Sequence, residues 1–331
     1  MMRRISMGLI ALVVAVGVIN KDRIMAKLRG TAPALATSAA PRPGEPPRAM
    51  TLPGLRKALK TTIGDGERDE TPAPEPPAGE LEKVYYNAPL GKNVAYVTPV
   101  KPGARRPAIV WIHGGFNFGI DDGVWTPSPR DNDQSAANFR KAGIAEMYPA
   151  LRGTSQNPGH RECFLGEIDD VLAAADFLAS RPDVDPKRIY LGGHSTGGLV
   201  ALLAAESTPR FRAVFAFGPV ADPRQYGKSS CVPRGASPAE TKPRAAIEFL
   251  SEIVTPTFVI DGANGNAGVF PLMQKRIGTA PVSFLAIPNA DHFNALAPGC
   301  DVVAKAILAD TGDKPAIHIT ANDIAAAMRG N

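Results

Sequence analysis

The sequence has few cysteines and no common cofactor motif. Its three cysteines, Cys163, Cys231 and Cys300, are too few and too scattered for a disulfide framework. None belongs to a Cys-x-x-Cys pair, which argues against a structural zinc site. Two of them can form one bridge, but three buried thiols are the simpler interpretation. No His-Glu-x-x-His motif occurs and no Gly-x-Gly-x-x-Gly follows a first strand, so the sequence predicts neither a metal nor a dinucleotide cofactor.

Most of the chain also lacks an excess of charge of either sign. The formal net charge is +5, and residues 1–30 alone contain six basic residues and one acidic residue. The remaining residues contain 31 of each sign. The larger part of the chain therefore has no basic excess of the kind that nucleic-acid-binding proteins use. Its 44% hydrophobic and 21% charged residues are typical of a globular protein.

The basic residues of the N-terminus flank an uncharged segment. Arg3 and Arg4 precede fifteen uncharged residues, 5–19, and four more basic residues follow before residue 30. A short basic region before an apolar run is typical of an export signal. Fifteen residues are short for a membrane span, which needs about 20. We expect residues 1–30 to be an export signal or a membrane anchor, with the folded domain outside the cytoplasm.

The next segment is rich in proline. Residues 31–80 contain ten prolines, a composition that disfavours regular structure and predicts a linker. One short helix is expected inside it, over residues 55–62. From about Leu81 the pattern changes, and we expect one folded domain over residues 81–331.

Strand-like and helix-like segments alternate in that domain. Two β-rich segments, 84–86 and 94–97, predict a leading antiparallel hairpin. Unbroken apolar runs predict buried strands at 107–112, 144–148, 188–191, 213–217, 257–260 and 282–287. Helical spacing predicts helices over 168–178, 199–205 and 321–328, the last opened by a capping box of Thr320 and Asp323. The sequence therefore predicts an α/β fold, with a mostly parallel central sheet flanked by helices.

Ser195 is the strongest candidate for a catalytic residue. It lies in Gly193-His194-Ser195-Thr196-Gly197, between a predicted strand and a predicted helix. A Gly-x-Ser-x-Gly segment in that context forms a sharp turn that raises the serine hydroxyl above the sheet. The helix N-terminus beneath it favours developing negative charge. This context predicts a nucleophile.

A glycine pair ends the strand at 107–112, in His113-Gly114-Gly115-Phe116. Acyl transfer needs two hydrogen-bond donors for the oxyanion of its tetrahedral intermediate. We expect the Thr196 N–H to be one donor and an N–H between Gly114 and Phe116 to be the other. His113 is expected to hold this loop.

A histidine and an acid are expected to assist Ser195. His292 is the histidine downstream of the nucleophile that falls in a loop directly after a predicted strand. Two carboxylates compete for the third place, because either could orient the imidazole and balance its charge. Asp261 ends the strand at 257–260 and is the first choice, and Asp222 after the strand at 213–217 is the second.

These residues together resemble the catalytic domain of the prolyl oligopeptidase family, from about Pro107 to Leu308. The likeness rests on the nucleophile motif and on three further segments, 148–153, 166–170 and 184–189. The resemblance implies the α/β-hydrolase fold, with Ser195 as nucleophile, His292 as base, and Gly115 or Phe116 with Thr196 as the oxyanion hole. The acid of that fold would fall on Gly265, where this chain has no carboxylate.

The expected function is that of a serine hydrolase cleaving an ester or short-peptide acyl bond through a Ser-His-acid mechanism. A carboxylesterase without peptidase activity is one alternative. A non-catalytic binding protein on a hydrolase scaffold is another, motivated by the displaced acid. The strained turn at Ser195 argues against the second alternative, because such strain costs stability.

Overall fold

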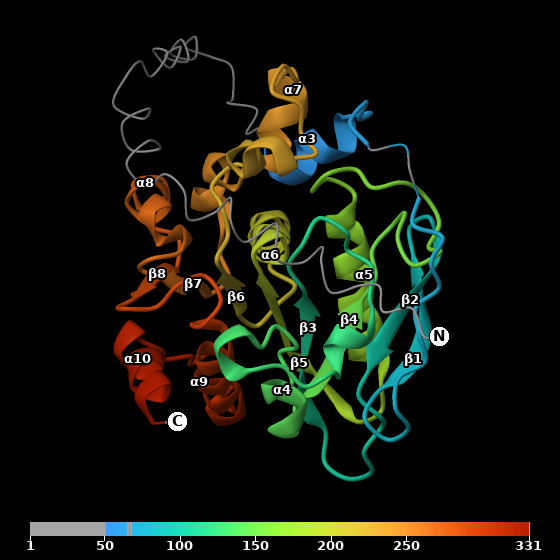
Figure 1. Ribbon diagram of the computed structural model, residues 1–331, viewed down its shortest axis with the longest axis vertical. Coiled ribbons are helices and arrows are strands. Elements are labelled where there is room, and N and C mark those ends of the chain that lie inside the picture. The colour runs from blue at the N-terminus through green and yellow to red at the C-terminus, as the bar shows by residue number, and fades with distance from the viewer. Residues whose placement is uncertain (1–50, 65, 67, 331) are drawn as a thin grey trace, which may run out of the picture. The chain divides into compact units, whose positions relative to one another are not determined.

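The computed structural model describes residues 51–64, 66 and 68–330 (Figure 1). The predicted export signal or anchor at residues 1–30, with its apolar segment 5–19, lies outside the described residues, as do residues 31–50 of the predicted linker. Within the described ranges, no helix is both long enough and apolar enough to cross a bilayer.

One eight-stranded sheet forms the centre of the domain, with the strand order β1-β2-β4-β3-β5-β6-β7-β8. The β1–β2 and β2–β4 pairs are antiparallel and the other pairs are parallel. This confirms the predicted fold class, a mostly parallel sheet with a leading antiparallel hairpin. The strands are β1 (Glu82–Ala88), β2 (Gly91–Val97), β3 (Arg106–Ile112), β4 (Ala145–Pro149), β5 (Val184–His194), β6 (Val214–Phe217), β7 (Thr257–Gly262) and β8 (Val282–Ile287).

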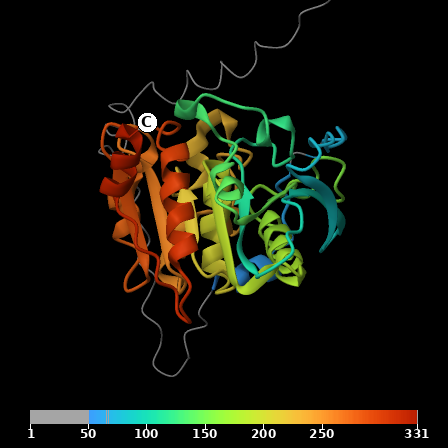
Figure 2. The ribbon, with the colours of Figure 1, turned by 90° about the horizontal axis from the view of Figure 1, so that it is seen from below.

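Helices cover both faces of this sheet (Figure 2). The α-helices are α3 (Leu52–Ala58), α4 (Asn138–Lys141), α5 (Glu167–Ser180), α6 (Thr196–Ser207), α7 (Pro238–Thr241), α8 (Phe270–Gln274), α9 (Leu296–Ala309) and α10 (Ala321–Arg329). Short 3-10 helices lie in the connections: η1 (Asp122–Val124), η2 (Arg130–Asn132), η3 (Pro223–Ser229), η4 (Lys242–Arg244), η5 (Ala246–Glu248), η6 (Leu250–Glu252) and η7 (Asn266–Val269). The predicted capping box of Thr320 and Asp323 opens α10.

The core consists of two apolar clusters, one on each face of the sheet. Side chains of α3, α5 and α6 belong to one cluster, and side chains of α4, α9 and α10 to the other. Along β3 the side chains alternate between them, because successive residues of a strand point to opposite faces. Val110 and Ile112 enter the first cluster and Ile109 and Trp111 the second. Burial on both faces explains why β3 is an unbroken apolar run.

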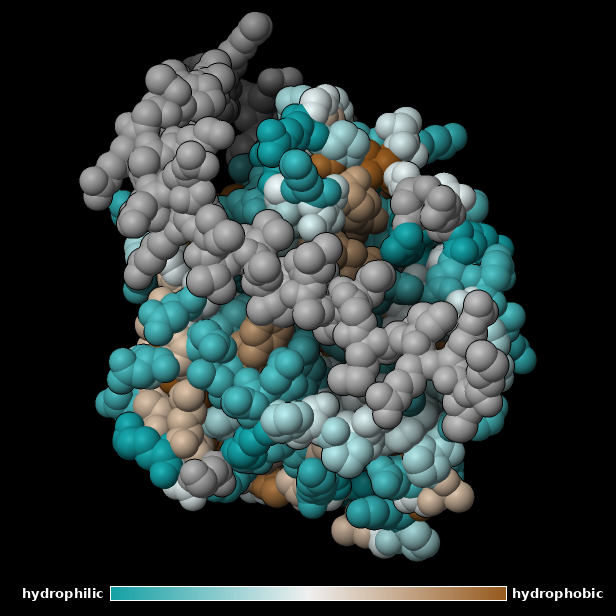
Figure 3. Space-filling model, in the orientation of Figure 1, coloured by the Kyte–Doolittle hydropathy of each residue, from teal (hydrophilic) through white to brown (hydrophobic). Residues whose placement is uncertain are grey.

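The described surface is largely polar. On the face shown in Figure 3, the described residues are mostly hydrophilic, with small apolar areas between them. The exposed large hydrophobic side chains of the described residues lie on separate elements and loops: Tyr85, Leu90, Val100, Val254, Leu272 and Leu308.

The described part of the predicted linker packs against the domain, which corrects the expected boundary at residue 81. α3 begins at Leu52, three residues before the predicted helix, and the Leu52 side chain is fully buried. Arg56 pairs with Asp169 of α5 at 2.6 Å. Proline excludes regular hydrogen bonding over residues 71–77, but an extended chain still offers carbonyl acceptors. The Tyr96 hydroxyl donates to the Pro74 carbonyl at 2.6 Å.

Two of the three cysteines form a disulfide, so the expectation of three thiols was wrong. Cys163 and Cys231 are bridged, with their Cα atoms 5.9 Å apart, while Cys300 is a buried free thiol. Cys163 follows β4 and Cys231 follows β6, and the carboxyl ends of parallel strands meet at one edge of a sheet. A separation of 68 residues gives no hint of this proximity.

Helix α9 was not predicted. It carries Pro298 and Gly299 in its first turn, residues that usually mark the end of a helix. Proline is tolerated there because the first N–H groups of a helix have no partner within the helix.

Candidate active site

Ser195 forms the whole connection between β5 and α6. β5 ends at His194 and α6 begins at Thr196. The backbone of Ser195 has φ 57° and ψ −115°, a conformation that a residue with a side chain rarely adopts and that stores strain. Its N–H donates to the Phe217 carbonyl of β6 at 2.7 Å, which fixes the turn to the neighbouring strand.

Packing explains the glycines on either side of the nucleophile. A Cβ atom on Gly193 would overlap the carbonyl oxygen of Gly197, and one on Gly197 would overlap the carbonyl of Ile112 in β3. Both overlaps involve backbone atoms, which cannot swing aside. The turn therefore requires glycine at both positions, as the sequence motif implies.

Asp261 and His292 lie together at the ends of β7 and β8. The Asp261 Oδ2 atom is 3.2 Å from the Nδ1 atom of His292. Asp261 is buried, with 2% of its surface exposed. Its Oδ1 atom accepts the Gly262 N–H at 2.8 Å, and its Oδ2 atom also accepts the Asn266 N–H at 2.5 Å. These backbone donors hold the carboxylate in one orientation toward the imidazole.

The position that the fold usually gives to the acid has no space for a side chain here. A Cβ atom on Gly265 would lie 2.7 Å from Asp261 Oδ2. The carboxylate that starts from the strand end thus fills the space beside Gly265. This geometry accounts for the departure from the usual pattern noted in the sequence.

Asp222, the alternative acid, has other partners. It is the N-cap of η3, where its side chain accepts the Arg224 N–H at 2.8 Å. It also pairs with the Arg224 guanidinium at 2.5 Å. The structure therefore brings Asp261, and not Asp222, into hydrogen-bond distance of His292.

His194 links the nucleophile turn to the histidine loop, a role that the sequence analysis missed. Its ring is buried, and its Nε2 atom lies 3.0 Å from the His292 carbonyl oxygen. The two imidazole rings are 4.6 Å apart between centroids. Burial, with the nearby His292 ring, lowers the pKa of His194 to about 3. The ring is therefore neutral at pH 7, and Nε2 must carry the proton because a carbonyl can only accept.

The Ser195 hydroxyl makes no hydrogen bond to the His292 ring within the described part of the chain. In free hydrolases this contact is often long, and it shortens when substrate binds. His194 provides a short physical connection between the two residues, since it is adjacent to Ser195 in the chain and bonded to the backbone of His292.

The predicted oxyanion loop lies against the nucleophile. A Cβ atom on Gly114 would be 3.3 Å from the Cβ of Ser195, and the Thr196 hydroxyl donates to the Gly115 carbonyl. Gly115 has φ 98°, which glycine adopts without strain. Among the described residues, the N–H groups of Gly115, Phe116 and Thr196 donate no hydrogen bond. They are therefore available to an oxyanion.

His113 stabilises the same loop, as expected. Its Nδ1 atom is 2.7 Å from the Gly114 carbonyl oxygen, and its Nε2 atom contacts the Gly119 carbonyl. The ring spans the loop and faces carbonyl groups, with neither nitrogen directed at Ser195.

Aromatic rings from three separate loops meet beside the oxyanion loop, which the sequence analysis did not anticipate. The Tyr226 ring of η3 contacts Phe116 edge to face, with 5.1 Å between centroids, and stacks on Phe164 at 6.3 Å. Phe164 in turn contacts Phe118 at 5.8 Å. No local sequence signal relates these positions, because they follow different strands.

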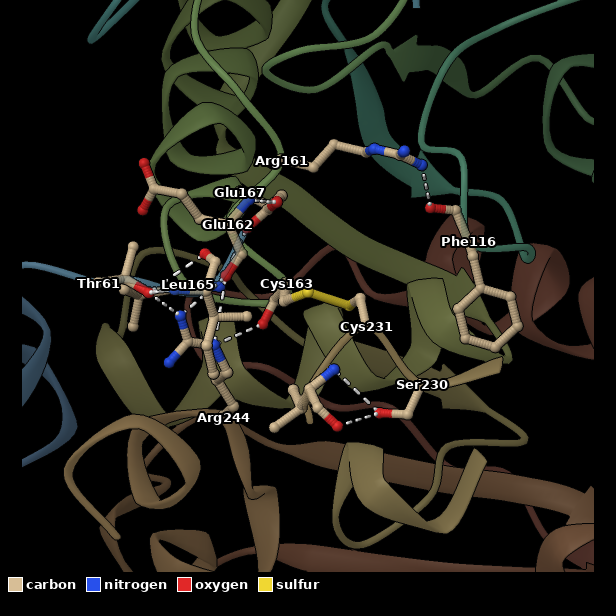
Figure 4. Close-up of a disulfide and its surroundings, with 12 residues drawn as sticks. Thr61, Phe116, Arg161, Glu162, Cys163, Leu165, Glu167, Ser230, Cys231 and Arg244 are labelled. Carbon is tan, nitrogen blue, oxygen red and sulfur yellow. Dashed lines mark hydrogen bonds between the residues drawn. A yellow bond between two sulfur atoms is a disulfide. The ribbon is translucent and has the colours of Figure 1, made fainter. Parts of the chain in front are cut away.

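The disulfide connects two of the segments that carry these rings, and Figure 4 shows the bridge with its surroundings. Cys163 precedes Phe164, and Cys231 follows η3, so the bridge joins the two segments that carry Phe164 and Tyr226. Arg244, which is fully buried, donates to the Cys163 carbonyl at 2.8 Å and to the Thr61 hydroxyl at 2.7 Å. This guanidinium fixes the bridged loop to the segment that precedes the sheet.

One family of known proteins matches part of the chain. Residues 132–263 match the prolyl oligopeptidase family. The family resemblance inferred from the sequence is confirmed. The matched segment runs from before β4 to the end of β7, and so includes Ser195 and Asp261.

Individual relatives match over part of their length. A thiohydrolase from Arthrinium phaeospermum is 32% identical over 126 residues, which are 37% of this chain and 38% of the relative. A puromycin-hydrolysing peptidase of Mycobacterium tuberculosis has a TM-score of 0.57 and 20% identity over 72% of this chain and 42% of its own. The 2,6-dihydroxy-pseudo-oxynicotine hydrolase has a TM-score of 0.57 and 16% identity over 74% of this chain and 72% of its own.

These comparisons establish the α/β-hydrolase fold and support a serine hydrolase. The chain spans less than half the length of the thiohydrolase and of the puromycin-hydrolysing peptidase. The match therefore concerns only part of each of these two proteins.

Proposed function

We propose that the protein is a serine hydrolase that cleaves an ester or short-peptide acyl bond, with Ser195 as nucleophile, His292 as base and Asp261 as acid. The hydrogen bond between Asp261 and His292, beside the strained turn at Ser195, carries this proposal. A non-catalytic protein would have no need to maintain both the strain and the oriented imidazole.

The mechanism follows from the hydrogen bonds of the site. The Asp261 carboxylate keeps the proton of His292 on Nδ1, which leaves Nε2 free to accept the Ser195 hydroxyl proton. The serine oxygen bonds to the acyl carbon, and the carbonyl oxygen becomes an oxyanion. His292 then returns the proton to the leaving group, and water releases the acyl group by the same steps.

The oxyanion is stabilised by N–H groups that donate no hydrogen bond to the described residues. Thr196 supplies one at the start of α6, and Gly115 or Phe116 supplies the other. Each donor of this kind contributes roughly 10²–10³-fold in rate in hydrolases where it has been removed. The N–H groups need no reorganisation, because β3, α6 and the His113 ring hold them in place.

Aromatic rings beside the site favour an apolar group on the substrate. Phe116 and Tyr226 lie next to the proposed oxyanion hole, and large rings provide apolar contact area. The choice between esters, thioesters and peptides rests on turnover, and the thiohydrolase relative makes an acyl thioester worth including.

The test is hydrolysis of a matched substrate panel by the wild type and by Ser195→Ala. The panel contains p-nitrophenyl acetate and butyrate, an S-butyryl thioester, and alanyl and glycyl-prolyl p-nitroanilides. Ser180→Ala, at an exposed serine of α5, is the control variant. We expect Ser195→Ala to abolish turnover and Ser180→Ala to leave it unchanged. Ester turnover without anilide turnover would select the carboxylesterase alternative, and no turnover of any substrate would select the binding protein.

We also propose that the domain acts outside the cytoplasm, exported or tethered through residues 5–19. The Cys163–Cys231 disulfide supports this, because such bonds persist in oxidising compartments. Fractionation of cells producing the full chain tests it. Activity in the exported or membrane fraction supports the proposal, and activity confined to the soluble cytoplasmic fraction contradicts it.

A further inference from the structure

The hydroxyl of Tyr226 is an unexplained polar group at the active site. Its oxygen is buried and has no hydrogen-bond partner among the described residues. Nearly all buried polar groups in proteins have a partner, so an exception calls for a functional explanation. Burial raises the pKa of Tyr226, and the Ser195 side chain partly offsets this rise.

The ring of Tyr226 is held on two sides. Phe116 contacts it edge to face at 5.1 Å from the loop after β3, and Phe164 stacks on it at 6.3 Å from the loop after β4. Because Phe116 belongs to the proposed oxyanion loop, this contact places the tyrosine next to the donors of that loop. A ring clamped in this way keeps its hydroxyl in one position relative to that loop.

The disulfide fixes the segment that carries the tyrosine. Cys231 lies five residues after Tyr226, and its partner Cys163 is adjacent to Phe164. The bridge therefore ties η3 to the loop on which the Tyr226 ring stacks. Figure 4 shows this bridge beside Phe116, whose carbonyl accepts a hydrogen bond from Arg161 at 3.1 Å. Both neighbours of the tyrosine ring are thus fixed by contacts outside the site.

We propose that the Tyr226 hydroxyl donates a hydrogen bond to the oxyanion that forms when Ser195 attacks the acyl carbon. It would be a third donor, from a different element than the N–H groups of Thr196 and the Gly114–Phe116 loop. This inference rests on the proposed function, since it needs a tetrahedral intermediate on Ser195.

Chemistry supports a donor role over a proton-transfer role. A tyrosine whose pKa is raised keeps its proton at neutral pH, so the hydroxyl donates a hydrogen bond and does not act as a base. The oxyanion forms beside the Gly114–Phe116 loop, so a hydroxyl on a ring that contacts Phe116 lies close to the developing charge. A donor whose acceptor becomes charged during the reaction stabilises the transition state more than the bound substrate.

The test compares Tyr226→Phe with Tyr86→Phe, using p-nitrophenyl butyrate. Phenylalanine retains both ring contacts of Tyr226 and removes only the hydroxyl. Tyr86 is the matched control, a buried tyrosine of β1 whose hydroxyl donates to the Ala150 carbonyl at 3.3 Å. We expect Tyr226→Phe to lower kcat by roughly 10²-fold with KM nearly unchanged, and Tyr86→Phe to leave kcat within twofold.

Inhibition by phenylboronic acid gives an independent measurement, because the compound forms a tetrahedral adduct on a serine nucleophile. We expect Tyr226→Phe to weaken this inhibition by a factor similar to its loss in kcat. A merely structural tyrosine would change thermal stability without this parallel loss. If the wild type is active and the kcat and inhibition constant of Tyr226→Phe both lie within threefold of the wild-type values, this inference is wrong. The proposed function would still stand in that case. A wild type with no turnover, or turnover retained in Ser195→Ala, would instead overturn the proposed function and this inference with it.

Discussion

Replacement of Asp261 by asparagine tests the proposed acid with little change in shape. The carboxylate accepts three hydrogen bonds, from the Gly262 N–H, the Asn266 N–H and the His292 ring. An asparagine side chain has one oxygen and one NH₂ group, so one of the two carboxylate positions must become a donor. In one orientation the NH₂ group faces the Gly262 N–H, so that two donors meet without an acceptor. In the other it opposes the Asn266 N–H and faces His292.

The second orientation has the larger effect on catalysis. An NH₂ group facing Nδ1 of His292 favours the tautomer that carries its proton on Nε2. A protonated Nε2 cannot accept the Ser195 proton. The corresponding change in a serine protease lowers kcat about 10⁴-fold. The first orientation keeps an oxygen toward His292 but removes its charge, so a smaller loss is expected. We therefore predict a fall in kcat/KM between about 10² and 10⁴-fold. Either orientation also leaves a buried donor unpaired, which costs about 1–3 kcal/mol of stability.

The assay measures p-nitrophenyl butyrate hydrolysis by Asp261→Asn and Asp222→Asn, together with their thermal unfolding. Asp222 is the matched control, because it is the alternative acid and pairs with Arg224 in the structure. We expect Asp222→Asn to stay within threefold of the wild type. A folded Asp261→Asn protein with nearly unchanged turnover would refute the assignment of Asp261, and a large loss in Asp222→Asn would transfer the role to that residue.

Three further predictions concern stability. Cys231→Ser should lower the free energy of unfolding by about 2–4 kcal/mol, measured by urea denaturation, because the open chain gains entropy in the unfolded state; an unchanged midpoint would show that the bridge adds no stability. Deletion of residues 1–80 should lower Tm relative to deletion of residues 1–50, since Leu52 and its neighbours leave the core, and equal Tm values would restore the linker interpretation. The pKa of His194 is lowered to about 3 in the folded state, so the unfolded chain binds a proton between pH 6.5 and 3 that the folded chain does not. Stability should thus fall as pH decreases through that range, and His194→Gln should reduce this slope in pH-dependent unfolding, whereas an identical slope would contradict the neutral, buried ring.

The sequence predicted the central strands and the nucleophile because both depend on local features. The apolar runs of β3 and β6 reflect burial on both faces of the sheet, a property that each strand carries in its own residues. The Gly193–Gly197 motif likewise encodes a steric requirement within five residues. Such features are visible without knowing which parts of the chain approach one another.

The features that were missed depend on distant segments meeting at the carboxyl edge of the sheet. The Cys163–Cys231 bridge joins residues 68 positions apart. The Tyr226 ring lies between loops that follow two other strands, and His194 bonds to a residue 98 positions away. Packing of the proline-rich segment was missed for a related reason, because composition predicts the lack of regular structure but says nothing about burial.

Reaction of the protein with a fluorophosphonate probe, followed by peptide mapping, tests the central claim most directly. The claim is that the strained turn presents Ser195 as a covalent nucleophile. One equivalent of probe should attach, and the modified peptide should carry it on Ser195. The Ser195→Ala variant should remain unlabelled while Ser180→Ala labels as the wild type does. Labelling of a different serine, or undiminished labelling of Ser195→Ala, would contradict the account.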